Sequence, residues 1–141
     1  MIAIDTNLFV YAHRAGAPEH GAAMRAIERA ARSGAGWGMA FSTVAEFLAV
    51  VTSPAHPKPS TAQEATRFIE AMTDAGCELW RPGPRLVANL LARAGELGVS
   101  GPRVFDLQIG LTAIEHGATE LWTHDMKFVK LPGLTVHDPL P

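Results

Sequence analysis

Short apolar runs rich in strand-forming residues alternate along this chain with longer stretches of helical composition. Strands separated by helices of about 10–15 residues favour parallel βαβ units, whose crossovers are right-handed. We therefore predict an α/β fold, a three-layer α/β/α sandwich around a parallel sheet. The expected strands span residues 2–4, 38–41, 77–81, 120–123 and 134–137. The expected helices span residues 8–12, 19–31, 44–51, 61–74, 84–97 and 101–116.

Capping residues predict where three of these helices begin. Pro18 stands where the first turn of the second helix would start, since proline suits that position. Ser60 is the expected cap of the helix over residues 61–74. Thr43 and Glu46 have the Thr-x-x-Glu spacing of a capping box, which predicts a helix start at that point.

The length of 141 residues suits one ordinary domain, and we expect a single domain over residues 1–141. Apolar residues make up 48% of the chain, enough for a buried core. No apolar run is long enough for a membrane helix, and no basic segment precedes the first apolar residues. We therefore expect a cytoplasmic protein with no membrane partner. Cys77, the only cysteine, is predicted to be a small buried apolar residue.

The formal net charge of −2 excludes a protein that holds nucleic acid by its overall charge. Any contact with RNA or DNA would need a local basic patch or a bound metal ion. The six histidines show no paired ligand spacing, so a zinc site is not expected.

Four acidic residues stand near the predicted carboxyl ends of the strands. Asp5 ends the first strand, Glu46 lies one turn into the helix after the second, and Asp125 follows the fourth. Asp106 lies near the start of the helix that leads into the fourth strand. Ligands of open α/β sheets bind beyond these strand ends, so we expect the four carboxylates to converge. Each acid alone could instead be a helix cap or a turn residue, but separate caps have no reason to converge.

Converging carboxylates favour a divalent cation. Crowded carboxylates raise one another's pKa and destabilise the fold unless a cation lies among them. A hard ion such as Mg²⁺ or Mn²⁺ accepts oxygen ligands and relieves this repulsion. Such an ion can also neutralise a scissile phosphate and supply the attacking water. The four acids therefore predict a metal-dependent nuclease site.

Five segments of the chain resemble a known family when they are taken in order and at their separations. They begin with Asp-Thr-Asn after the first strand and end with Thr-His-Asp after the fourth. The pattern resembles the PIN-domain ribonucleases, and within them the VapC toxin family of type II toxin–antitoxin systems. The segments are residues 5–7, 43–47, 105–109, 113–119 and 123–128.

The resemblance implies an endoribonuclease that uses Mg²⁺, with Mn²⁺ able to substitute. The products would carry 5′-phosphate and 3′-hydroxyl ends, and the RNA targets would be tRNA or ribosomal RNA. The resemblance further implies strand order 3-2-1-4-5, a homodimer, and inhibition by a small antitoxin protein that covers the acidic site.

The resemblance also implies roles for the four acids. Asp5 and Asp106 would be the principal metal ligands. Glu46 would complete the site or orient its water. Asp125 would bind a second ion or act through water. The position one turn after Asp106 holds Ile109, where some relatives carry a further acid, which leaves open whether one or two ions bind.

Five polar residues would support these ligands and the substrate. Thr6 and Thr123 would supply hydroxyls behind the ligands, and Asn7 would help to hold its loop. Arg103 and Lys127 lie within a turn of the proposed acids and are the candidates for contacts with RNA phosphates.

Two other functions remain open at this stage. A phosphatase of the Asp-x-Asp kind needs a second acid two residues after the first, and that position is Asn7. A non-catalytic PIN-like module that binds RNA or a partner would more often have lost some of the acids. For the implied homodimer, we expect an interface from Phe9, Val10 and the Ala-rich residues 22–31.

Overall fold

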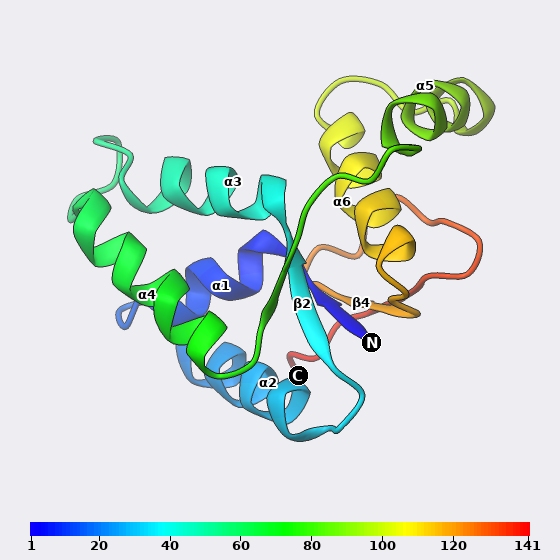
Figure 1. The fold of residues 1–141 in the computed structure, drawn as a ribbon. Helices are drawn as coiled ribbons and strands as arrows, with labels where there is room; N and C mark the ends of the chain where they lie inside the picture. The colour runs from blue at the N-terminus through cyan, green and yellow to red at the C-terminus, as the bar shows by residue number, and fades with distance from the viewer.

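Five parallel strands form the central sheet of the protein, which we describe from a computed structural model of residues 1–141. The order is β3-β2-β1-β4-β5, as the resemblance implied (Figure 1). β1 lies in the middle, with Ala3 opposite Gly38 of β2 on one side and Leu121 of β4 on the other. The strands are β1 (Ile2–Ile4), β2 (Trp37–Ala40), β3 (Glu78–Trp80), β4 (Glu120–Trp122) and β5 (Thr135–His137).

Six helices cover the two faces of this sheet and confirm the predicted three layers (Figure 1). Residues of β1 alternate between the faces, because successive side chains of a strand point in opposite directions. Ile2 and Ile4 pack with α1 to α4, whereas Ala3 packs with α5 and α6. The helices are α1 (Thr6–His13), α2 (His20–Arg32), α3 (Phe41–Val51), α4 (Ala62–Asp74), α5 (Leu86–Leu97) and α6 (Arg103–Glu115).

Gly38 lets β2 and β3 pack as closely as they do. A Cβ atom at this position would lie 2.5 Å from the ring of Trp80, a fully buried side chain of β3. Only glycine leaves room for this indole, so Trp80 can close the core beneath α6. Cys77, just before β3, is buried at 4% exposure, as predicted.

All three predicted helix caps differ from the observed ones, by one residue for α2 and α4 and by three for α3. α3 begins at Phe41, directly after β2, so Thr43 lies inside the helix and caps nothing. α4 is capped by Thr61, whose side chain forms a capping box with Glu64, and not by Ser60. α2 begins at His20, which leaves Pro18 in the preceding turns.

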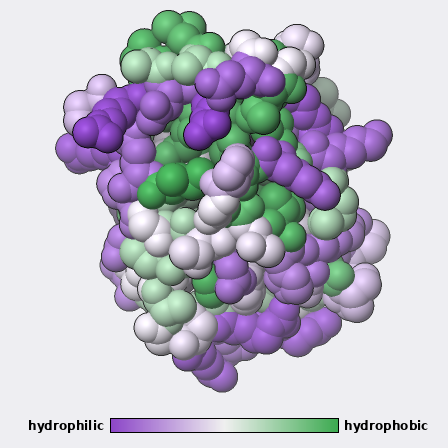
Figure 2. All heavy atoms as spheres, turned by 90° about the vertical axis from the view of Figure 1, so that its right-hand side faces the viewer, coloured by the Kyte–Doolittle hydropathy of each residue, from purple (hydrophilic) through white to green (hydrophobic).

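The surface expected for dimerisation is largely wrong, because most of its apolar residues are buried in the core. Phe9 and Val10 of α1 are buried, and so are the alanines of α2 that follow the helical repeat. The most exposed apolar side chains lie on α5 and α6, where Val87, Leu91 and Phe105 are 58–72% exposed, while Met24 of α2 is 45% exposed. Apolar residues gather on that side of the molecule (Figure 2). No helix has the length and apolar character needed to cross a membrane.

Candidate active site

Asp5 occupies the point where β1 becomes α1, at the middle of the sheet's carboxyl edge. It is the N-cap of α1, and its Oδ1 accepts a hydrogen bond of 2.8 Å from the amide of Thr6. Its Oδ2 accepts one of 2.8 Å from the hydroxyl of Thr123, which follows the neighbouring strand β4. The side chain is nearly buried, at 7% exposure. Asp5 therefore caps α1 and also lies among the converging acids, so the two interpretations of this residue do not exclude each other.

Asn7 and Thr123 connect the loops after β1 and β4 across the sheet edge. The Asn7 amide nitrogen donates to the Thr123 hydroxyl at 2.9 Å, and the Asn7 oxygen accepts from the amide of His124 at 3.2 Å. The Thr123 hydroxyl also accepts from the amide of Asp125 at 3.0 Å. These bonds fix the relative positions of Asp5 and Asp125.

Glu46 approaches Asp5 from the second turn of α3. The Thr6 hydroxyl donates to Glu46 Oε2 at 3.5 Å, while Oε1 is buried without any hydrogen-bond partner. Burial raises the pKa of Glu46, and the charges of Asp5 and Asp106 add to the rise. An unpartnered carboxylate oxygen among other acids is a position where a cation would be stabilising.

Asp106 and Asp125 come from the first turn of α6 and from the loop after β4, and Arg103 bridges them. One guanidinium nitrogen donates to Asp106 Oδ2 at 2.7 Å and to Asp125 Oδ2 at 2.9 Å. Partial burial raises the pKa of Asp125, but hydrogen bonds from Arg103 and from the Lys127 amide outweigh this and lower it overall. Arg103 thus stands as the counter-ion for this half of the site.

The four predicted acids line a single cavity of about 400 Å³ at the sheet's carboxyl edge. Burial raises the pKa of Asp5 to about 6, although its hydrogen bonds oppose the shift, and Asp106 and Asp125 raise it further. The same cavity is lined by Tyr11 and Arg14, which the sequence interpretation did not assign to it. Convergence of the acids is therefore observed, and their net charge is unfavourable without a cation.

A divalent cation fits this donor set. All four acids offer oxygen atoms, which hard cations prefer, and one of these oxygens lacks any partner. No group of three or more acidic, His or Cys side chains is already arranged to hold an ion. The Arg103 guanidinium pairs with both Asp106 and Asp125. An ion that binds these two carboxylates would therefore compete with this arginine.

The other predicted contacts are placed with mixed results. Lys127 donates its backbone amide to Asp125 Oδ1 at 2.9 Å, while the residue itself is exposed. Arg103 points at the carboxylates, a pairing that the sequence analysis did not predict although its i,i+3 spacing to Asp106 is typical of such pairs. His124 lies 2.9 Å from Asp138 through its Nδ1 and packs edge-on against Tyr11.

Comparison with known proteins supports the same family as the motifs. The PIN-domain family model matches residues 2–134. Ribonuclease VapC43 of Mycobacterium tuberculosis is 30% identical over 142 residues, covering 99% of this chain and 96% of that protein.

Two solved structures share the fold. VapBC2 from Rickettsia felis, bound to a DNA fragment from its promoter, has a TM-score of 0.69 at 20% identity and covers 97% of this chain and 98% of that chain. VapC20 of M. tuberculosis, described as a toxin that cleaves the sarcin–ricin loop, has a TM-score of 0.69 at 14% identity and covers 91% and 92% of the two chains. With its strand order, its edge of carboxylates and these relatives, the chain belongs to the PIN-domain family, among the VapC proteins.

Proposed function

We propose that this protein is a Mg²⁺-dependent endoribonuclease, the toxin of a toxin–antitoxin pair, with Mn²⁺ able to replace Mg²⁺. The observation that carries the proposal is the cavity in which Asp5, Glu46, Asp106 and Asp125 meet with Arg103 bridging two of them. Relatives named as VapC ribonucleases support the activity. The products would be 5′-phosphate and 3′-hydroxyl ends, because water would attack phosphorus and the 3′ oxygen would leave.

We assign each residue of the site a role according to its position in the cavity. Asp5 and Asp106 would be the principal ligands of the ion, with Glu46 completing the site and Asp125 binding directly or through water. When bound, the ion would neutralise the scissile phosphate and lower the pKa of the attacking water. Thr6, Asn7 and Thr123 would act behind the ligands, since their hydrogen bonds hold Asp5 and the Asp125 loop.

Arg103 and Lys127 would bind RNA phosphates beside the ion. Arg103 already contacts two of the cavity's carboxylates, so releasing them would leave its guanidinium beside the substrate. Lys127 is exposed two residues beyond Asp125, on the same rim. The substrate class would be tRNA or ribosomal RNA, in keeping with VapC20, a structural relative that cleaves the sarcin–ricin loop.

Two protein partners belong to the same proposal. The Rickettsia felis structure is a VapBC complex, which supports an antitoxin that covers the acidic cavity here. A homodimer would use the exposed apolar side chains of α5 and α6, Val87, Leu91 and Phe105. Leu91→Glu should then convert the dimer to a monomer in equilibrium sedimentation. A cytoplasmic location stays a prediction from the sequence.

Cleavage of a total RNA pool by purified, antitoxin-free protein tests the activity. Reactions with Mg²⁺, Mn²⁺ or a chelator, and with Asp5→Asn, should give discrete fragments only when metal and Asp5 are both present. Mapping the fragment ends would identify the target and the end groups. Absence of fragments from a folded protein, with no metal bound in calorimetry, would leave the binding module as the explanation.

The non-catalytic alternative is supported by one observation. No three acids are arranged to hold an ion, and Arg103 neutralises two of them without metal. Such a module would bind RNA or a partner equally well with a chelator and with Mg²⁺. A trapped aspartyl-phosphate would instead revive the phosphatase interpretation.

A further inference from the structure

A second cavity adjoins the acidic one and is lined by basic and polar groups. It has a volume of about 550 Å³ and lies between the end of α1, the turn that follows it and the loop between α3 and α4. Tyr11 and Arg14 line both cavities, so the two adjoin at these residues. We call this second cavity the α1 groove; its lining residues also include His13, His56, Lys58 and Ser60.

The charge of the α1 groove is opposite to that of the acidic cavity. Arg14 donates one nitrogen to the carbonyl of Val50 at 2.9 Å, and this bond holds its guanidinium at the junction. Lys58 is exposed on the rim and forms no ion pair. The only acid in the lining, Glu64, accepts hydrogen bonds at Oε1 from the amide and the hydroxyl of Thr61. Arg14 and Lys58 are therefore the two cations of the α1 groove that have no acidic partner.

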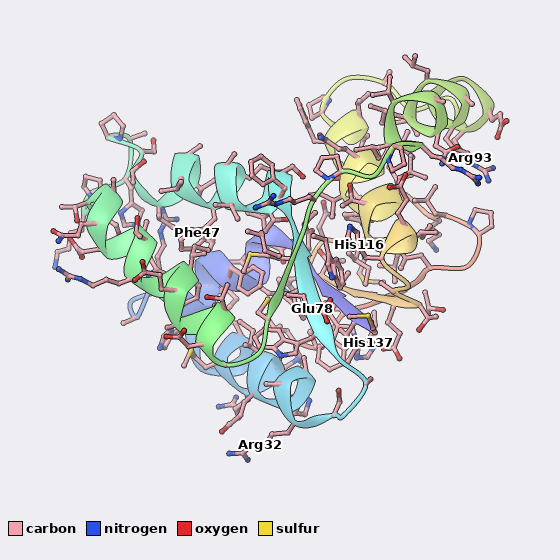
Figure 3. The ribbon with its side chains drawn as sticks, in the orientation of Figure 1. Arg32, Phe47, Glu78, Arg93, His116 and His137 are labelled. Atoms are coloured by element: carbon pink, nitrogen blue, oxygen red, sulfur yellow. The ribbon has the colours of Figure 1, made fainter.

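The floor and turn of the groove are ordered and offer further donors. His13 hydrogen-bonds Ser60 at 2.8 Å and packs on Phe47 and Phe68, with ring centroids 5.4 and 5.2 Å away. Phe47 lies between α3 and α4 beneath this end of the molecule (Figure 3). The backbone amides of Ala15 and Gly16 form no hydrogen bond within the protein, so they are available to an anion.

An aromatic ring stands at the junction of the two cavities. Tyr11 is partly exposed, and its ring packs edge-on against His124 at 6.0 Å between centroids. Aromatic side chains beside a basic path are how single-stranded nucleic acid is held without sequence preference, since every base has a face that stacks. Tyr11 has the position for one base next to the cleaved bond.

The other basic stripe of the molecule lacks these features. Arg25, Arg29 and Arg32 share one face of α2, but the cavities that they line have no residue in common with the acidic cavity. Arg29 already contacts the carbonyl of Pro139 and the ring of Trp122, and Arg32 is paired with Glu28. The α2 stripe therefore does not continue the site.

We propose that the α1 groove binds the single-stranded flank of the RNA substrate, with Tyr11 stacking on a base and Arg14 and Lys58 binding consecutive phosphates. This inference rests on the proposed function and adds to it the path by which RNA leaves the acidic cavity. The groove would contact the RNA backbone and only one base, so it would contribute to affinity more than to sequence specificity.

Binding of a fluorescent single-stranded RNA to full-length Asp5→Asn protein tests the groove without cleavage. Lys58→Glu should weaken binding about tenfold and make its salt dependence shallower, by roughly 0.7 in the log–log slope for each RNA phosphate that the protein no longer binds. Lys130→Glu is the matched control, because Lys130 is exposed, lines neither cavity and changes the net charge equally. It should change affinity less than about twofold.

Stacking is tested by a second pair of variants. Tyr11→Leu should weaken RNA binding about tenfold, within the range expected for one stacked base, while Tyr11→Phe should retain it. Thermal melts of both variants check that the fold is intact. Equal RNA affinity for Lys58→Glu, Tyr11→Leu and Lys130→Glu would contradict RNA binding in the α1 groove.

The outcomes separate this inference from the proposed function. If the unmodified protein cleaves RNA and the groove variants bind and cleave like the control, the groove is wrong and the nuclease stands. If the unmodified protein cleaves nothing, the nuclease is wrong, and the binding comparison still decides the groove. If the variants lose affinity only for a protein inhibitor, the groove is a protein site and the RNA path is wrong.

Discussion

The two halves of the acidic cavity are built in opposite ways. Asp5 is nearly buried and held by Thr6 and Thr123, with Asn7 bonded behind them. Asp125 keeps 40% of its side chain exposed and is held by Arg103, itself 37% exposed. The first half is fixed by neutral hydrogen bonds, and the second by an ion pair that a competing cation can replace.

This difference shows in the direction of the pKa shifts. The pKa of Asp5 rises to about 6 because burial outweighs its hydrogen bonds, while the pKa of Asp125 falls because bonds from Arg103 and the Lys127 amide outweigh partial burial. The charged form of Asp5 is therefore unfavourable in the folded protein, whereas the charge of Asp125 is already neutralised by Arg103. A bound divalent ion would relieve the strained half and displace the cation of the other.

The largest expected effect is on cleavage by variants of the two halves. Asp5→Asn should reduce the rate at least about a hundredfold, because it removes the most buried of the proposed metal ligands, and Asp125→Asn about tenfold, since that position is partly solvated. Initial rates on one mapped RNA site would measure both. Equal losses would mean that the halves contribute alike and that burial does not decide the ligand's importance.

The pH dependence of stability should also separate the halves. The folded pKa of Asp5, about 6, lies above its ordinary 3.8, so the folded state binds the proton more tightly. Without metal, Asp5 should lower the free energy of unfolding as pH rises from about 4 through about 6, by on the order of 3 kcal/mol. Denaturant unfolding in chelator at several pH values would measure this, and the fall should vanish in Asp5→Asn.

Asp125 should have the opposite sign. The pKa of Asp125 is lowered in the folded state, so its stabilising contribution is present above the ordinary aspartate range and is lost as pH falls below it.

Cleavage should decrease as pH falls through about 6, because protons then compete with metal for Asp5. A cleavage rate that stays flat down to about pH 4 would contradict metal binding by these acids.

Removing the Thr123 hydroxyl should destabilise the fixed half. Thr123→Val leaves Asp5 Oδ2 and the donors of Asn7 and Asp125 without this partner, so we expect a loss of about 2 kcal/mol. Thr112→Val is the matched control, because Thr112 is equally buried but bonds only a carbonyl of its own helix. The control should cost less than about 1 kcal/mol in the same urea titration.

The smallest effect should come from the exchangeable half. Arg103→Met removes the guanidinium that competes for Asp106 and Asp125, so Mg²⁺ affinity in calorimetry should rise several-fold. Stability should change little, because the arginine side of the pair is over a third exposed and solvent screens the interaction. Arg93→Met, which breaks the exposed i,i+3 pair with Glu96, should leave Mg²⁺ affinity unchanged. Weaker metal binding in Arg103→Met would show that the arginine organises the carboxylates.

Local pattern alone was sufficient for the layers of the fold and for the convergence of the four acids. Short continuous apolar runs, separated by helical stretches, can bury both of their faces only between two layers of helices. Acids placed after strands must meet at one edge when the strands are parallel, and Asp5 and Asp125 do so. Helix starts were less predictable, since β2 runs into α3 with no separate cap and Thr43 became a core residue.

Tertiary structure alone decided which groups neutralise and hold these acids. The Thr123 hydroxyl reaches Asp5 across 118 positions of sequence, and Arg103 reaches Asp125 across 22. It also decided that Phe9 and Val10 are core residues and that Tyr11 and Arg14 join the acidic cavity to the α1 groove. The physical reason is that burial, charge pairing and cavity shape depend on which distant segments pack together, and periodicity along the chain carries no record of that packing.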